Sequence, residues 1–94
     1  MSGKYAFTKG LKELRFLHCQ TSGHSTEVRS FLTRAYPIMK YHNPHTPIMI
    51  REAMGVEPRV YARYEFGKEK VADLMGMDGK AIEEQVTALV KDDR

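Results

Sequence analysis

The sequence predicts one α/β domain with a four-stranded mixed sheet flanked by helices, and with elements in the order β-α-β-β-β-α. Apolar residues alternate along the strand-like runs and recur every three or four positions along two helical runs. A strand, a helix and a second strand in succession favour a parallel pair joined by a crossover, and the later strands favour an antiparallel hairpin. With 94 residues, the chain can bury one modest core. We expect residues 1–10 to form a flexible arm and residues 11–94 to form the domain.

The first strand is expected over residues 11–20. Leu14 and Phe16 lie on one side of this strand, and Leu17 and Cys19 lie on the other. Apolar residues on both sides predict a central strand that is covered on both faces of the sheet.

The first helix follows a turn in which Ser22 or Ser25 can accept a hydrogen bond from the first helical amides. Pro37 lies inside the helical pattern and predicts a kink or a break, because proline lacks an amide proton and clashes with the preceding turn. The expected apolar stripe of this helix consists of Val28, Phe31, Leu32, Ala35 and Met39.

Three further strands and a second helix complete the expected domain. The strands are predicted over residues 48–53, 59–66 and 68–74, the last of them a charged edge strand. Asp78 is expected to cap the second helix. The buried stripe of that helix consists of Ile82, Val86, Leu89 and Val90.

The third strand has two chemically different sides. Val60, Ala62, Tyr64 and Phe66 form the predicted core side, and Arg59, Tyr61, Arg63 and Glu65 form the other. Arginine and tyrosine are enriched in protein interfaces, and Arg51 in the preceding strand can pair with a carboxylate of the domain or of a partner. We therefore predict that Arg51, Arg59, Tyr61 and Arg63 bind a partner, with a solvated edge as the alternative.

Charge is distributed unevenly along the chain. Residues 1–51 contain eight Lys or Arg and two acidic residues, a net charge of +6, whereas residues 52–94 contain seven and ten, a net charge of −3. A basic half can attract RNA, anionic lipid or an acidic protein surface. No transmembrane segment is expected, because no apolar run approaches the ~20 residues that span a bilayer.

Two segments carry a family resemblance, LKELRFLHCQTSGHSTEVRSFL and REAMGVEPRVYARYEFG. The first has a Cys-x-x-Ser pattern at a strand-to-helix turn, and the second has Pro58 at the entrance of a strand. Together they resemble the small thioredoxin-like accessory subunits of mitochondrial respiratory complex I (NADH:ubiquinone oxidoreductase). That domain family is shared with some mitochondrial ribosomal proteins. The resemblance implies a thioredoxin-like fold.

The resemblance also implies a function and a location. Such a chain is a non-catalytic accessory subunit that supports assembly and stability of the NADH-oxidising module of the matrix arm, beside the large iron–sulfur subunit. It is peripheral on the matrix side of the mitochondrial inner membrane. It carries no flavin, cluster or quinone, so no cofactor is expected.

Cys19, Ser22 and Pro58 then form a vestigial thioredoxin-like site. Many members of the family carry a second cysteine where this chain has Ala53, so two-cysteine chemistry is not expected here. The matching proline is often cis in thioredoxin-like folds, and we expect a cis Glu57–Pro58 bond. A trans proline at a strand start is the alternative.

No catalytic motif and no metal site is predicted. His42 and His45 are separated by Asn43 and Pro44, and a zinc site needs three or four convergent ligands. Two alternative functions remain open. One is a mitochondrial ribosomal protein that binds RNA. RNA-binding domains usually cluster basic and aromatic residues, and because the basic residues of this chain are dispersed, no nucleic-acid partner is predicted. The other is a monothiol redox protein that uses Cys19, which as a lone cysteine is more typical of a buried, inert residue.

Overall fold

The computed structural model describes residues 7–19 and 23–91. The elements within these residues are β1 (Leu11–His18), η2 (Gly23–Ser25), α1 (Thr26–His42), β2 (Ile48–Glu52), β3 (Arg59–Tyr64), η3 (Glu65–Gly67), β4 (Glu69–Asp73) and α2 (Gly79–Lys91). The predicted class and the order β-α-β-β-β-α are confirmed, and the arrangement is compatible with a thioredoxin-like domain.

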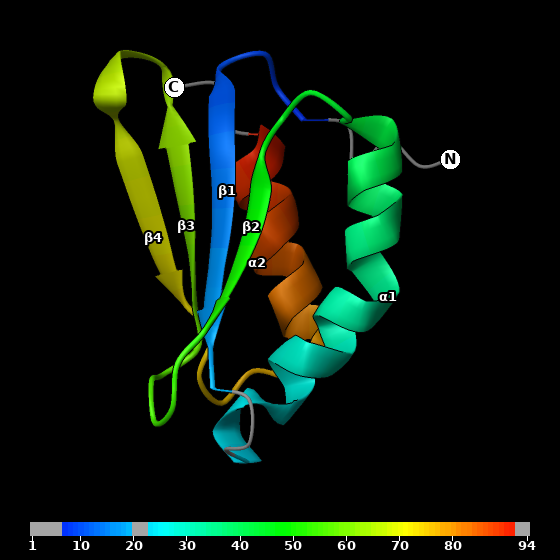
Figure 1. Ribbon diagram of the computed structural model, residues 1–94, viewed down its shortest axis with the longest axis vertical. Coiled ribbons are helices and arrows are strands. Elements are labelled where there is room, and N and C mark those ends of the chain that lie inside the picture. The colour runs from blue at the N-terminus through cyan, green and yellow to red at the C-terminus, as the bar shows by residue number, and fades with distance from the viewer. Residues whose placement is uncertain (1–6, 20–22, 92–94) are drawn as a thin grey trace.

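The four strands form one mixed sheet in the order β2-β1-β3-β4 (Figure 1). β1 pairs in parallel with β2, and antiparallel with β3, which continues as a hairpin into β4. β1 is therefore a central strand, as predicted, and β2 and β4 are the two edges.

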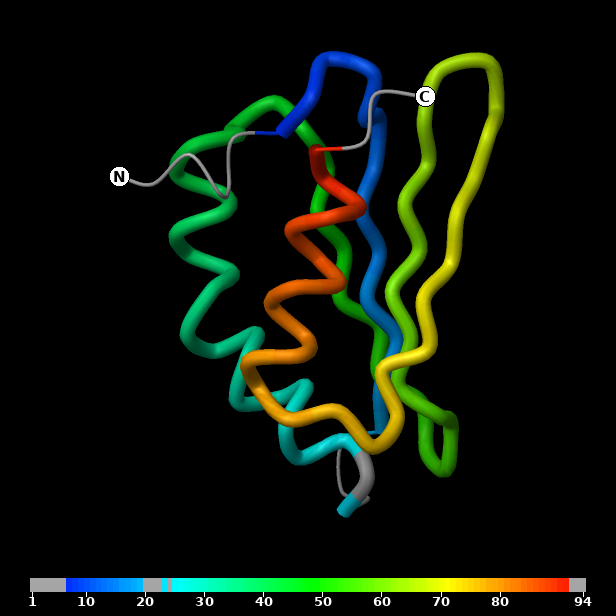
Figure 2. The backbone as a smooth tube through the Cα atoms, turned by 180° about the vertical axis from the view of Figure 1, so that it is seen from behind, coloured from blue at the N-terminus to red at the C-terminus, as the bar shows by residue number. Residues whose placement is uncertain are grey.

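Both helices pack on the same face of the sheet (Figures 1 and 2). They contact each other, and α2 also contacts β3. The core lies between the two layers, where Phe16 and Val60 of the strands meet Phe31 and Val86 of the helices, all of them fully buried. The expectation that β1 is covered on both faces is wrong. Two amphipathic helices with one apolar stripe each supply one covering layer, and nothing in the described residues covers the second face.

Helix α1 begins without the predicted serine cap. The Ser25 hydroxyl makes no capping hydrogen bond and instead accepts one from the Cys19 amide at 3.0 Å. Ser22 lies outside the described residues. The helix continues unbroken through Pro37, and its ribbon bends part-way along (Figure 1). The predicted apolar stripe is buried at every position, namely Val28, Phe31, Leu32, Ala35 and Met39.

The third strand is shorter than predicted. It ends at Tyr64, and Phe66, which was expected on the core side, is 94% exposed in the following turn. Alternation on the core side stops there because Phe66 has a positive φ of 65° and leaves the extended conformation. The first two strands also end earlier than predicted, at His18 and Glu52.

Helix α2 is tied to the sheet and to the N-terminal segment by polar contacts. Asp78 Oδ1 accepts a hydrogen bond from the Ala81 amide at 2.9 Å, which confirms the predicted cap. The Tyr64 hydroxyl donates to the Leu89 carbonyl at 2.6 Å, satisfying one of the free carbonyls at the helix end. The Thr8 amide donates to the Val90 carbonyl at 2.9 Å. Residues 7–10 of the expected arm are therefore held against the domain, and residues 1–6 lie outside the described part.

Neither α1 nor α2 is long and apolar enough to cross a membrane, and the described residues contain no other α-helix.

The buried stripe of α1 gives the first prediction. Phe31→Asp places an unpaired carboxylate in a fully buried position, at a cost of several kcal/mol that is comparable with the whole stability of a small domain. We expect no cooperative thermal transition by circular dichroism. Ser30→Asp, on the exposed side of the same helix, is the matched control and should change stability by less than about 0.5 kcal/mol. A Phe31→Asp chain that melts like the wild type would contradict this core.

Candidate protein-docking surface

The sheet face opposite the helices is uncovered in the described part of the chain, and we call it the open face. Strand register assigns its residues, because neighbours such as Arg15 and Tyr61 alternate with the buried pair Phe16 and Val60. The open face consists of Glu13, Arg15, Leu17, Met49, Arg51, Arg59, Tyr61, Arg63, Glu69, Val71 and Asp73.

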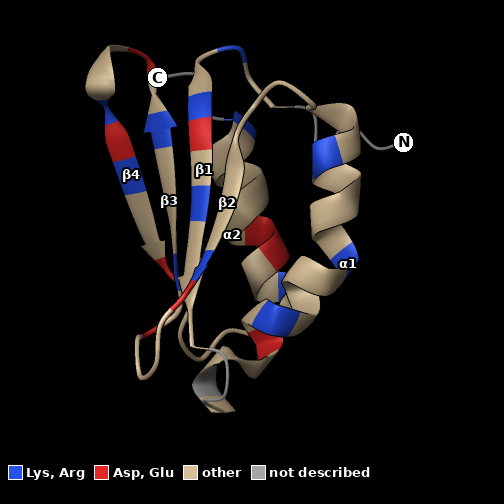
Figure 3. Cartoon of the chain, in the orientation of Figure 1, with Lys and Arg blue, Asp and Glu red and all other residues tan. Residues whose placement is uncertain are grey.

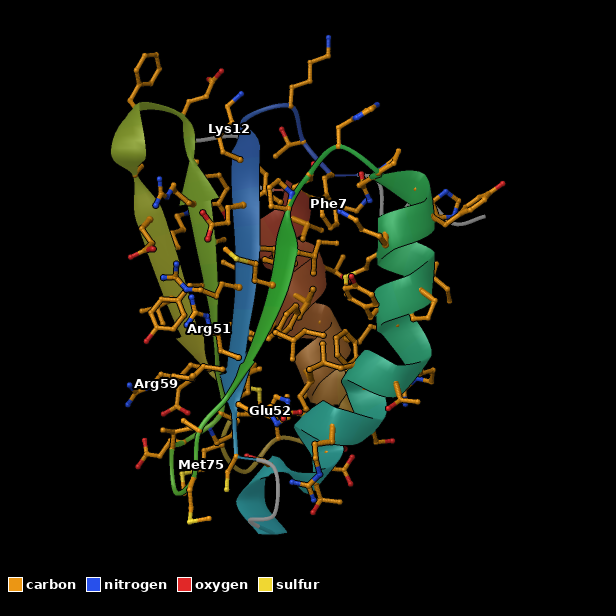
Figure 4. The ribbon with its side chains drawn as sticks, in the orientation of Figure 1. Phe7, Lys12, Arg51, Glu52, Arg59 and Met75 are labelled. Carbon is orange, nitrogen blue, oxygen red and sulfur yellow. The ribbon has the colours of Figure 1, made fainter. Side chains whose placement is uncertain are left out.

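All four residues predicted to bind a partner lie on the open face. Arg59, Tyr61 and Arg63 project from β3, and Arg51 projects from β2, with β1 between the two strands. Figure 4 shows Arg51 and Arg59 directed away from the helices, while Glu52, the neighbour of Arg51, is directed toward them. Arg51 and Glu52 are both exposed, because β2 is an edge strand of a sheet with one bare face.

An ion-pair network holds three strands of the open face together. The Arg15 guanidinium donates to Glu13 at 3.2 Å and to Glu69 at 3.3 Å, and Arg63 Nε lies 3.6 Å from Glu13. The Glu13 side chain is only 15% exposed, whereas that of Glu69 is 44% exposed. Solvent therefore screens the charge of Glu13 less than that of Glu69. Arg15 also lies over the Tyr61 ring, 4.9 Å from its centroid. The network therefore fixes Arg15, Tyr61 and Arg63 in place (Figure 3 shows the mixed charges on the strands).

Arg51 differs from the other arginines of the open face. It lines a shallow hollow of about 360 Å³ together with Arg15, Leu17 and Tyr61. Among the described residues Arg51 has no hydrogen-bond or ion-pair partner. An exposed guanidinium beside apolar and aromatic side chains can take a carboxylate in a bidentate pair. The hollow is suited to an acidic side chain of a docked protein.

Arg59 is held at the end of the open face beside the loop that precedes β3. Its guanidinium lies 3.2 Å from Glu57. A hydrogen bond to the Tyr61 side chain, more than the nearby Glu57 and Asp73 carboxylates, raises the pKa of Arg59 above its ordinary value. Arg59, like any arginine at neutral pH, is a permanent positive charge on this surface.

Comparison with known proteins identifies the family. Residues 28–78 match the domain family described as the mitochondrial ribosomal protein L51 / S25 / CI-B8 domain. The chain belongs to this family. The resemblance predicted from the sequence is confirmed.

Three relatives of the family are similar over most of their length. The chain is 62% identical over 91 residues to the NADH-ubiquinone oxidoreductase 10.5 kDa subunit of Neurospora crassa, covering 97% of each chain. It is 40% identical over 91 residues to NADH dehydrogenase [ubiquinone] 1 alpha subcomplex subunit 2 of Arabidopsis thaliana, covering 97% of this chain and 94% of the relative. It is 40% identical over 73 residues to the mouse subunit of the same name, covering 78% of this chain and 74% of the relative.

The expected vestigial site is only partly described. Cys19 is 2% exposed, and its sulfur accepts a hydrogen bond from the Gly55 amide at 3.2 Å. α1 begins at Thr26, so the thiol does not lie in the first turn of that helix. Pro58 is buried at the start of β3, and Ser22 lies outside the described residues.

The expected cis bond before Pro58 is wrong, because every peptide bond of the described residues is trans. The Pro58 carbonyl accepts a hydrogen bond from the Leu74 amide at 2.9 Å, which places this proline in the extended entry to β3. A trans bond suits that position and is the lower-energy form of an X-Pro bond.

Histidines do not form a metal centre in the described residues. Buried His18 points Nδ1 at the Cys19 carbonyl, 3.1 Å away, and Nε2 at Glu52, 3.9 Å away. His42 and His45 are exposed. No three His, Cys, Asp or Glu side chains of this part of the chain lie together as metal ligands would.

Sequence reasoning missed Glu13, Arg15 and Glu69, which support the predicted residues. The signal was present in β1, where Arg15 and Leu17 alternate with Leu14 and Phe16. The alternation was not read as an exposed polar face, because β1 was expected to be covered by a second layer on the side of Arg15 and Leu17.

The shared role of Glu13 gives the second prediction. Glu13→Gln removes the carboxylate that Arg15 and Arg63 share, and we expect it to lower the free energy of unfolding by about 1 kcal/mol in denaturant titrations. Glu65→Gln is the matched control, because among the described residues Glu65 forms an ion pair only with exposed Lys12, at 3.8 Å, and this pair should contribute less than about 0.5 kcal/mol. Equal losses for the two variants would contradict a supporting role of Glu13.

Proposed function

We propose that the chain is a non-catalytic accessory subunit of NADH:ubiquinone oxidoreductase (complex I) that docks through its open face. The observation that carries the assignment is the 62% identity over 97% of a subunit of that enzyme from Neurospora crassa. The names of the Arabidopsis thaliana and mouse relatives support the same assignment.

The open face supports a docking role. It extends over all four strands and combines apolar contact area from Leu17, Met49 and Val71 with fixed Arg and Tyr side chains. Interfaces favour this composition, in which aromatic and arginine anchors lie among apolar groups. Arg51 supplies a positive charge for a carboxylate of the partner, and the fixed network reduces the side-chain entropy lost on docking.

The chemistry of the open face favours binding over catalysis. Glu13 and Glu69 are both paired with Arg15, which lines the hollow. A carboxylate engaged by a guanidinium is already occupied as a hydrogen-bond acceptor and serves here to position Arg15. Electron transfer in this proposal belongs to other subunits.

The finer placement follows the family resemblance. We place the chain in the matrix arm, beside the large iron–sulfur subunit of the NADH-oxidising module, where it supports assembly and stability of that module. It is then peripheral on the matrix side of the mitochondrial inner membrane. Binding to the native state of a neighbour stabilises that neighbour by mass action.

Native electrophoresis with mass spectrometry, on mitochondria carrying a tagged copy of the chain, tests the proposal. Co-migration with NADH dehydrogenase activity is the expected result. Co-migration with ribosomal RNA and proteins would instead identify a ribosomal protein. A free small species would contradict the subunit assignment and favour a monothiol redox protein.

The third prediction concerns the open face. Tyr61→Ala combined with Arg63→Ala should leave the chain folded, because neither side chain is fully buried. The double variant should be lost from the complex in native gels, because it removes an aromatic and a cationic anchor.

Tyr41→Ala combined with Arg34→Ala removes the same two residue types from the exposed side of α1 and is the matched control. Its incorporation should equal that of the wild type. Normal incorporation of the Tyr61/Arg63 double variant would show that the open face is not part of the docking site.

The fourth prediction separates docking from thiol chemistry. Cys19→Ser should be incorporated normally, because the serine hydroxyl can accept the Gly55 hydrogen bond that the sulfur accepts. Ala53→Ser, an exposed substitution in the adjoining loop, is its control. Loss of a glutathione-dependent activity in Cys19→Ser with the fold intact would favour the monothiol enzyme.

A further inference from the structure

Phe66 is the most exposed large apolar residue among those described. It is 94% exposed, in the turn η3 that joins β3 to β4. Figure 1 shows this turn at the outer corner of the sheet, beyond the ends of both strands. No ring contact of Phe66 with another described residue is present. The core therefore does not account for this aromatic side chain.

The backbone at Phe66 is unfavourable for a phenylalanine. Phe66 has φ 65° and ψ 25°, and Gly67 follows with φ 75°. Two successive positive φ values define the type I′ hairpin turn, in which Asn-Gly is the preferred pair. A bulky residue with positive φ is strained, and such strain clusters at binding sites. Phe66 therefore occupies a position where asparagine would suit the fold better.

The surroundings of Phe66 are positively charged. The Glu65 amide donates to the Gly10 carbonyl at 3.0 Å, so the turn lies beside the segment that enters β1. Lys9, Lys12 and Lys68 are exposed at this corner, and within residues 7–19 and 23–91 Glu65 forms an ion pair with Lys12 alone, at 3.8 Å. The corner continues directly into the open face through Arg63 of β3 and Glu69 of β4, which lie opposite each other in the strand register.

We infer that Phe66 is an anchor that inserts into an apolar pocket on a neighbouring protein subunit, with carboxylates of that subunit around the pocket. Projecting aromatic residues fill such pockets and contribute a large share of interface free energy. The lysines of the corner complement an acidic rim, and the adjoining open face extends the same contact. The inference rests on the proposed function and adds a second docking element outside the open face.

A protein pocket suits Phe66 better than a membrane surface. Interfacial membrane binding requires a broad apolar face with several aromatic or aliphatic residues. At this corner Phe66 lies between Glu65 and Gly67 and close in sequence to Lys68, and Glu65 contacts the segment that carries Lys9 and Lys12. One aromatic ring among charges fits a single concave site.

Phe66→Asn in the full chain tests the inference, because it restores the preferred Asn-Gly turn while removing the anchor. We expect the melting temperature of the purified chain to stay equal or rise by a few degrees. In mitochondria, competition against the wild type in native gels should show at least a tenfold loss of incorporation into the complex.

The controls separate the possible failures. Tyr41→Gln removes an aromatic side chain that is 80% exposed on α1, and it should be incorporated like the wild type. Wild-type incorporation of Phe66→Asn would overturn the anchor and leave the proposed function intact. Absence of the wild-type chain from the complex would overturn the proposed function and the anchor with it.

Vesicles of equal parts phosphatidylcholine and cardiolipin test the membrane alternative. The wild-type chain should not sediment with them. Sedimentation that is lost in Phe66→Asn would overturn the protein pocket and assign the residue to a lipid surface.

Discussion

The packing of both helices on one face of the sheet is the constraint on which the rest of the structure depends. Phe16 of β1 and Phe31 of α1, with ring centroids 6.3 Å apart, are at the centre of that contact. A small chain has only enough apolar surface for one such core. The other face of the sheet is consequently left to long polar side chains, among which Arg15 packs over the Tyr61 ring.

The elements that local pattern determines were predicted well. The stripe of α1 and the cap at Asp78 follow from spacing and side-chain chemistry, and Arg51, Arg59, Tyr61 and Arg63 share a face because alternation along strands is geometric. The failures have a different origin. Alternation in β1 cannot reveal how many layers the helices supply, and the turn at Phe66 departs from the residue types that signal a hairpin. The trans bond before Pro58 depends on tertiary surroundings.

The division between a packed face and an open face separates the residues that hold the fold from those available to a partner. Its description joins ribosomal proteins to a CI-B8 domain, so one domain type serves in more than one setting. The core residues fix the fold, whereas the open face and the β3–β4 corner are free of that requirement. Arg51 and Phe66 can thus be chosen for a partner without loss of the core, which is how one fold supports different associations.

Hydroxyl-radical footprinting of the free chain and of the assembled complex measures whether the open face is the surface buried on docking. If the open face is docked, oxidation of Tyr61 and Met49 falls several-fold in the complex, because a docked surface excludes water from these side chains. Oxidation of Tyr41, which is 80% exposed on the helical side, should stay unchanged. Protection of Tyr41 with unchanged oxidation of Tyr61 would show that the helical side, and not the open face, is docked.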